Sequence, residues 1–98
     1  MNRFAYQAYY EYSGPTHSSP FRTRKSDDEV QEALSAFASD LCHFLTDPDA
    51  QVTPDEAKRT PNSIVVVILT KDLEGEVDDA VKRCLNSFDL FGTKIGQV

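Results

Sequence analysis

The chain has 98 residues, a mass of 11.0 kDa and a formal net charge of −6 at pH 7. A chain of this length forms a single domain, residues 1–98, whose small core leaves little room for a deep catalytic cleft with a cofactor. Hydrophobic residues make up 40% and charged residues 27%, which is typical of a soluble globular protein and excludes a disordered one.

The sequence carries no targeting or membrane signal that we recognise. Its N-terminus lacks the apolar core of a secretory signal, and its longest apolar run, residues 64–69, is far shorter than the about 20 residues that cross a bilayer. Cys42 and Cys84 are too few for a disulfide framework, and each lies beside the apolar stripe of a predicted helix. These features predict a cytoplasmic protein with reduced, partly buried cysteines and no membrane partner.

Residues 4–12 are rich in aromatic side chains and alternate with a period of two, which predicts a strand with one buried face. One face would carry Phe4, Tyr6, Ala8, Tyr10 and Tyr12, and the other Ala5, Gln7, Tyr9 and Glu11. Residues 16–25 are either a loop or a second strand that returns as a hairpin, and Pro20 would confine that strand to an edge of the sheet.

The first predicted helix begins at Ser26, which forms a capping box with Glu29. An apolar stripe with helical spacing follows, and it consists of Val30, Ala33, Leu34, Phe37, Ala38, Leu41, Phe44 and Leu45. Asp47 and Pro48 end this helix. Residues 47–61 are an irregular insertion, in which Thr53 and Pro54 predict one or two helical turns.

Residues 63–70 are apolar without alternation, which predicts a central strand with apolar groups on both faces. Two helices cover only one face, so the other face is available to a partner or to another copy of the chain. Asp72 caps the second predicted helix, whose stripe runs from Leu73 to Phe88 and which ends near Gly92. Residues 93–98 can add a short terminal strand.

These elements predict an α/β (α+β) fold: a small two-layer sandwich with two long amphipathic helices on one face of a two- to four-stranded sheet. The order is β-(β)-α-(short α)-β-α-(β), where parentheses mark short or optional elements. If the strands at 4–12 and 63–70 are neighbours, the helical connection makes them parallel. Both helices then begin at the same end of the sheet.

We find no constellation of residues that predicts an enzyme, a metal site or a cofactor site. His43 and Cys42 are adjacent on one helix and point about 100° apart, so they form no dyad there, although a dyad of His43 with Cys84 across the helix pair remains open. The spacing of the cysteines and histidines fits no zinc site. Residues 47–58 lack the glycine and glutamate of a calcium loop, and the four glycines form no phosphate-binding loop.

Acidic residues are concentrated in two stretches without bases, Asp27 to Glu56 and Asp72 to Asp79. Acids at helix starts offset the helix dipole, but this does not account for the acids from Glu32 to Asp49. If both helices begin at one end, their first turns form a negative edge that attracts a basic protein; the alternative is a merely solvated surface. The candidate partner-binding residues are Asp27, Asp28, Glu32, Asp40, Asp47, Asp49, Glu74, Glu76, Asp78 and Asp79.

A competing nucleic-acid site would use a basic patch of Arg22, Arg24 and Lys25, beside Phe21 and near several tyrosines. The net charge of −6 and the absence of a longer basic stripe argue against direct nucleic-acid binding.

The layout has a leading strand, a helix that opens at Ser26–Asp27, Leu41–Cys42 late in that helix, and a strand that ends at residues 68–70 before Leu73–Glu74–Gly75. With the acidic charge, this layout resembles the small inhibitor proteins of phages and mobile elements, such as anti-CRISPR proteins and the T7-type antagonist of the host nucleoid protein H-NS. The resemblance implies a non-enzymatic protein that binds and inhibits a basic host protein or nucleoprotein complex. The alternatives are an immunity protein or antitoxin, and a homo-oligomeric subunit that pairs through residues 64–69.

Overall fold

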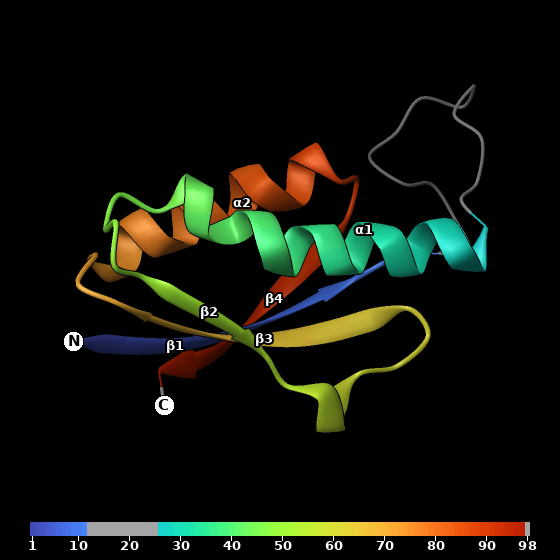
Figure 1. The fold of residues 1–98 in the computed structure, drawn as a ribbon, viewed down its shortest axis with the longest axis horizontal. Coiled ribbons are helices and arrows are strands. Elements are labelled where there is room, and N and C mark those ends of the chain that lie inside the picture. Colours follow the sequence, from blue (N-terminus) through green and yellow to red (C-terminus); the bar gives the residue numbers. More distant parts are fainter. Residues whose placement is uncertain (12–25, 98) are drawn as a thin grey trace.

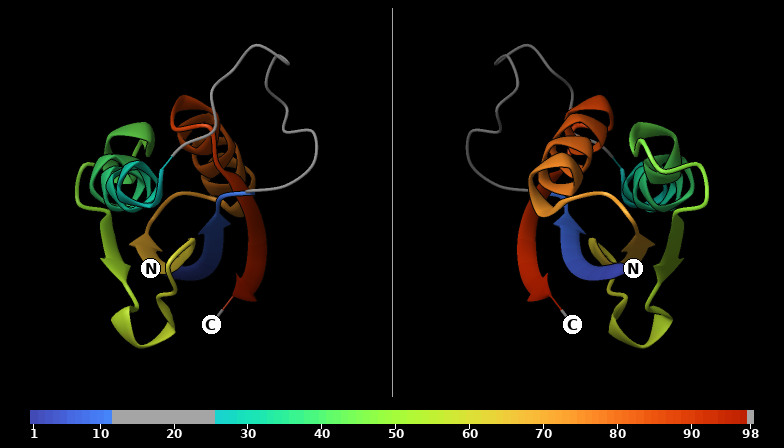
Figure 2. Two further views of the ribbon diagram at one scale, coloured as in Figure 1. Left: turned by 90° about the vertical axis from the view of Figure 1, so that its right-hand side faces the viewer. Right: turned by 90° about the vertical axis from the view of Figure 1, so that its left-hand side faces the viewer.

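A computed structural model describes residues 1–11 and 26–97 and shows one antiparallel sheet with two α-helices. The elements follow the order β1 (Asn2–Tyr9), α1 (Asp27–Asp40), η1 (Leu41–Phe44), β2 (Gln51–Pro54), η2 (Glu56–Lys58), β3 (Ser63–Thr70), α2 (Glu74–Ser87) and β4 (Phe91–Gln97) (Figure 1). The spatial order of the strands is β2-β3-β1-β4. Both helices lie on one face of the sheet, which confirms the two-layer α+β sandwich (Figure 2).

The expected parallel pairing is wrong, because β1 and β3 are neighbours but run antiparallel. The reason is β2, a strand that lies within the predicted insertion at 47–61 and that the sequence did not reveal. After α1 the chain enters β2, which runs parallel to β1 but two places away, and β3 then folds back between them. This is the split β-α-β arrangement of ferredoxin-like folds. The helical turn expected in the same insertion is present as η2.

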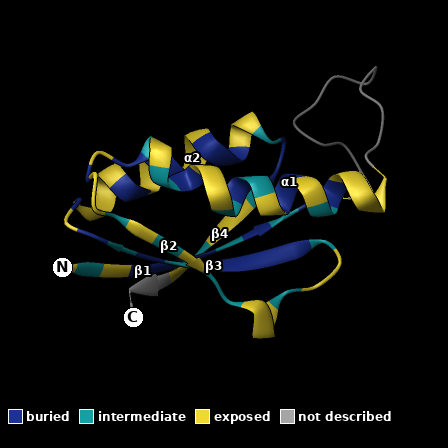
Figure 3. Cartoon of the chain, viewed as in Figure 1, coloured by how far each residue is buried: buried dark blue, intermediate teal, exposed yellow. Residues whose placement is uncertain are grey.

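The capping box of α1 is confirmed. Ser26 Oγ accepts a hydrogen bond from the Glu29 amide at 3.3 Å, and Glu29 Oε1 accepts one from the Ser26 amide at 3.0 Å. The helix is shorter than its apolar stripe predicts, because it ends at Asp40 and continues as the 3-10 turn η1, which carries Leu41 into the core. The inward sides of both helices are buried and their outward sides exposed (Figure 3).

The ends of α2 differ from those expected. Leu73, not Asp72, is its N-cap residue, and the Leu73 side chain is 68% exposed instead of joining the buried stripe. The helix ends at Ser87, and Asp89, with a φ of 59°, makes the left-handed turn that we expected near Gly92. Gly92 has another role: a Cβ there would lie 2.3 Å from Leu85 Cδ1, so the glycine makes room for the Leu85 side chain beside β4.

The core lies between the helices and the inner face of the sheet. Of the two faces that alternation gives this strand, the core takes the one with Phe4, Tyr6, Ala8 and, just after β1, Tyr10, each at most 4% exposed. β3 contributes Ile64, Val66 and Ile68 to the same cluster. No helix within the described residues is long and apolar enough to span a membrane.

Candidate functional site

All 16 acidic residues of the chain lie in helices, turns or loops, and none lies in a strand. The only charged residues in the strands are two bases, Arg3 in β1 and Lys94 in β4. Lys94 faces the helical layer, where its ammonium group pairs with α2. The molecule therefore has an acidic helical side and a sheet whose strand residues include no carboxylate.

The acidic starts of the two helices do not converge, so the expected single negative edge is wrong. In Figure 1, α1 begins at the right of the view and α2 at the left, because antiparallel pairing of β1 with β3 reverses the second half of the chain. Asp27, Asp28 and Glu32 therefore lie at the end opposite to the start of α2. The structure brings the start of α2 together instead with η1 and the loop at residues 45–50.

Two acids at this junction have structural roles. Asp72 is buried, and its carboxylate accepts hydrogen bonds from the Thr46 amide at 3.0 Å and from the Thr46 hydroxyl. Asp47 is also buried, and it accepts hydrogen bonds from the amides of Asp49 at 2.9 Å and Lys71 at 2.8 Å. These amides hold the pKa of Asp47 below its usual value. Asp47, expected on the binding surface, instead joins two loops.

Glu74 and Asp78 form a polar connection between α2 and the sheet. Lys94 Nζ lies 2.8 Å from Glu74 Oε1 and 3.2 Å from Asp78 Oδ1. The buried Tyr6 hydroxyl donates a hydrogen bond to Asp78. Burial and this bond raise the pKa of Tyr6 above its usual value, so the phenol remains a donor. Both acids thus orient α2, and substitution of either one disturbs the fold as well as the surface.

The exposed carboxylates at this junction form what we call the acidic end: Asp40, Asp49, Glu74, Glu76, Asp78 and Asp79. Four bases lie in the same region, of which Lys94 and Arg83 are paired; Arg83 Nε lies 3.0 Å from Asp79 Oδ2. The other two, Lys71 and Lys82, are exposed. With buried Asp47 and Asp72, eight carboxylates face four cations, so this end stays negative.

Asp40 is an acid whose position does not help to stabilise the fold. It is exposed at the last residue of α1, where the helix dipole is negative and a carboxylate is unfavourable. Neither a salt bridge nor a side-chain hydrogen bond joins Asp40 to another residue in the described ranges. Its charge therefore adds to the potential of the acidic end without stabilising the helix that carries it.

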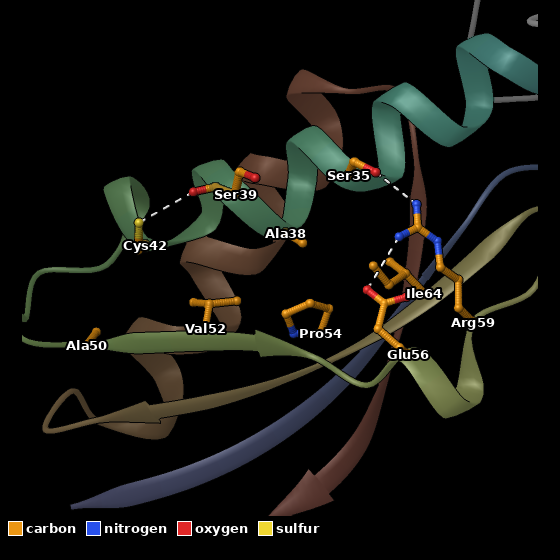
Figure 4. Close-up of a pocket in the computed structure, with 10 residues that line it drawn as sticks. All are labelled: Ser35, Ala38, Ser39, Cys42, Ala50, Val52, Pro54, Glu56, Arg59 and Ile64. Carbon is orange, nitrogen blue, oxygen red and sulfur yellow. Dashed lines mark hydrogen bonds and ion pairs between the residues drawn. The ribbon is translucent and has the colours of Figure 1, made fainter.

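A shallow groove of about 380 Å³ lies between α1 and the edge strand β2 (Figure 4). Its floor is apolar, with Val52 and Ile64 among the lining residues. Its one cation, Arg59, is already engaged: the guanidinium donates to Gln31 Oε1 at 3.1 Å and Ser35 Oγ at 2.8 Å, and it pairs with Glu56. We therefore assign no ligand to this groove.

Neither cysteine is hydrogen-bonded to His43 in the described part of the chain. Cys84 is buried, and its Sγ donates to the Phe37 carbonyl oxygen at 3.8 Å. Burial raises the pKa of the Cys84 thiol to about 12, and Asp40 and Cys42 act in the same direction, so the nucleophilic thiolate does not form near neutral pH. His43 is exposed on η1. Among residues 1–11 and 26–97, no three potential ligands gather to hold a metal ion.

The outer face of the sheet, here called the open face, is a second candidate surface. Strand alternation places on it Arg3, Ala5, Gln7 and Tyr9 of β1, and Val65, Val67 and Leu69 of β3. The Tyr9 ring stacks on Phe91 of β4, with ring centroids 5.9 Å apart. The sequence predicted the apolar run of β3 on two faces, but not this aromatic pair, which depends on the register of β4.

The basic patch proposed at Arg22, Arg24 and Lys25, and the hairpin considered at 16–25, lie outside the described residues. Comparison with known proteins finds no matching family model and no matching curated protein. The resemblance to small phage inhibitors therefore stays a prediction.

Proposed function

We propose that this chain is a non-enzymatic binding protein whose acidic end docks on a basic surface of another protein and blocks it. The partner is a basic host protein or a nucleoprotein complex, reached through its protein component. The biological role most consistent with the charge and size is that of a small phage inhibitor of the anti-CRISPR type.

The observation that carries this proposal is Asp40, an exposed carboxylate at the unfavourable end of α1. An acid in the last turn of a helix costs about 0.3–1 kcal/mol relative to a neutral residue. The chain nevertheless places it directly before η1 and the loop that carries Asp49 and is hydrogen-bonded to Asp72 before α2. A surface that concentrates carboxylates at a cost in stability is suited to a basic partner.

The physical consequence is association steered by charge. A negative patch raises the rate at which a positive surface meets it, and salt screens this attraction over about 10 Å at 0.1 M ionic strength. The same patch repels the phosphates of free nucleic acid. Binding to the partner should therefore weaken as salt rises.

The experiment uses two variants with equal charge change at opposite ends of the helical layer. Asp40→Asn/Asp49→Asn/Glu76→Gln removes three charges from the acidic end, and Asp27→Asn/Asp28→Asn/Glu32→Gln removes three from the start of α1. Each changes the formal net charge from −6 to −3, so a difference between them cannot come from net charge. Circular dichroism verifies that both variants are folded.

Tagged protein is used to capture partners from a host lysate at low and high salt, with mass spectrometry as the readout. We expect one basic protein or complex with the wild type, and at least about tenfold less of it with the acidic-end variant. The variant at the start of α1 should retain it. Equal loss with both variants, or no loss with either, contradicts the proposal. A captured cognate toxin would instead identify an immunity protein or antitoxin.

A further inference from the structure

We propose that Leu73 and Gly75 form the apolar contact of the acidic end, at which Leu73 inserts into an apolar cleft of the basic partner. The inference rests on the proposed function and adds the chemistry of the partner: a protein surface whose apolar cleft is bordered by lysine or arginine. We call Leu73 and Gly75 the α2 contact.

Leu73 is a large apolar residue that the fold leaves in solvent. Its side chain is 68% exposed, although the other residues of the apolar stripe of α2 are buried. Met1, which is 75% exposed, lies at the same end, because the Asn2 side chain donates a hydrogen bond to the Asp72 carbonyl oxygen at 2.9 Å (Figure 1). Thus two of the three large apolar side chains that are at least half exposed in the described ranges lie at the acidic end.

The position of Leu73 is unfavourable for the helix that follows it. Leu73 is the N-cap residue of α2, and helices prefer a residue there whose side-chain oxygen accepts a hydrogen bond from a first-turn amide. Leucine has no such oxygen, and no side-chain hydrogen bond caps α2. The described start of α1 shows the alternative, since Ser26 accepts this bond from the Glu29 amide. Serine would therefore suit the start of α2 better than leucine does.

Gly75 is likewise not required by the fold. It is exposed in the first turn of α2, and a Cβ there would have no heavy atom within 4 Å. Its backbone is helical, so the position needs no glycine for a left-handed conformation. Glycine is a poorer helix former than alanine, and its bare backbone permits close approach of another molecule. The α2 contact thus combines an exposed apolar side chain with an open stretch of backbone.

The backbone of the α2 contact is held rigidly. The Leu73 amide donates to Glu76 Oε1 at 3.0 Å, and the Leu73 carbonyl oxygen accepts from the Val77 amide at 3.0 Å. The preceding residue, Asp72, is buried, and its amide donates to Thr70 Oγ1 at 3.0 Å. The backbone is therefore fixed on both sides of an exposed side chain. A contact that is already ordered loses little conformational freedom when a partner binds.

The charges around the α2 contact determine the chemistry of the partner. Glu74 and Glu76 are exposed on either side of Gly75, and the remaining carboxylates of the acidic end lie around them. In protein interfaces a well-packed centre contributes most of the affinity, and a polar rim excludes water from it. The surface complementary to an apolar residue within an acidic rim is an apolar cleft within a basic rim. Free nucleic acid has the wrong charge for this rim.

Two fluorescent peptides with the same number of lysines test the proposal. In one, leucines form an apolar stripe at helical spacing between the lysines, and the other is oligolysine. Fluorescence anisotropy measures the binding of each peptide to the full chain. We expect the wild type to bind the lysine–leucine peptide at least about tenfold more tightly than oligolysine. This preference should persist when salt weakens the binding of both peptides, because salt screens charge and not apolar contact.

Two variants should improve the helix and impair the contact. Leu73→Ser supplies an N-cap oxygen and Gly75→Ala a better helix former, so each should raise the melting temperature by about 2–8 °C. Each should nevertheless reduce the preference for the lysine–leucine peptide at least about threefold. Asn86→Ala is the control, because it replaces an exposed, poor helix former near the other end of α2 and should leave the preference unchanged.

A wild type that binds both peptides equally, or binds neither, overturns the proposal. So does an unchanged preference in both Leu73→Ser and Gly75→Ala, or a loss of stability in both, since the fold itself would then require these residues. Asp40→Asn/Asp49→Asn/Glu76→Gln separates this inference from the proposed function. It should weaken the binding of oligolysine, and that result would support the acidic end even where the α2 contact fails.

Discussion

The two sides of this small protein differ in what covers them and in how they are charged. The helical side buries the core and carries nearly all the acids, with an excess of carboxylates where α2 begins. The outward-facing strand residues of the open face include Arg3 and no carboxylate, and the η2 turn with Glu56 borders this face. Because strands alternate their side chains, β3 can contribute Val66 to the core and Val67 to the open face with no residue between them.

The difference separates acidic from apolar surface within one domain of 98 residues. A charged surface is sensitive to salt and acts over several ångströms, whereas an apolar face acts by contact and gains from salt. Each of the following substitutions tests whether the two sides are as distinct as their composition indicates.

The largest expected effect is a difference in the free energy of unfolding between substitutions on the two faces of β3. Ile68 is fully buried under the helices, and Leu69, the next residue, lies half-buried on the open face. Ile68→Ala should lower the free energy of unfolding by about 2–5 kcal/mol, because it leaves a cavity in the core. Leu69→Ala should lower it by less than about 1.5 kcal/mol. Urea unfolding in dilute solution measures both, and equal losses would contradict the assignment of the faces.

A smaller effect should appear at Asp47 and depend on pH. Its folded pKa is depressed, so its contribution to stability is fully present above the unfolded value of about 3.9 and is lost as the pH falls through the folded pKa. Asp47→Asn should therefore be less stable than the wild type at neutral pH, and the difference should shrink below about pH 4. Thermal unfolding across this range tests it; a difference that does not change with pH would show that the Asp47 charge contributes nothing.

The smallest expected effect is a rise, not a fall, in the free energy of unfolding. Asp40→Asn should raise the free energy of unfolding by about 0.3–1 kcal/mol, because it removes a negative charge from the negative end of α1. Asp28→Asn, in the first turn, is the matched control and should lower it by a similar amount. Chemical denaturation at low ionic strength measures both. Destabilisation by Asp40→Asn would reveal a structural role for this carboxylate and remove the main support for the acidic end.

The features that could be predicted from the sequence are local ones. Ser26 and Glu29 are three residues apart and form their capping box within one helical turn, and the alternation of β1 divides its residues into two faces. Unbroken apolar character marked β3 as an inner strand because both of its faces carry apolar side chains. The existence of both helices follows from their apolar stripes.

What could not be predicted depends on contacts between distant segments. β2 has four residues, two of them exposed and one a proline, so nothing in its composition distinguishes it from a loop. Without β2, antiparallel pairing of β1 with β3 could not be inferred, nor could the opposite directions of the helix starts. The role of Asp47 likewise depends on Lys71, 24 residues away, and no local pattern signals that hydrogen bond.

The most direct test of the acidic end as a binding surface is capture from a host lysate with the two charge-matched variants. The account predicts that Asp40→Asn/Asp49→Asn/Glu76→Gln loses the partner that the wild type binds, and that Asp27→Asn/Asp28→Asn/Glu32→Gln retains it. Equal capture by both variants would contradict it.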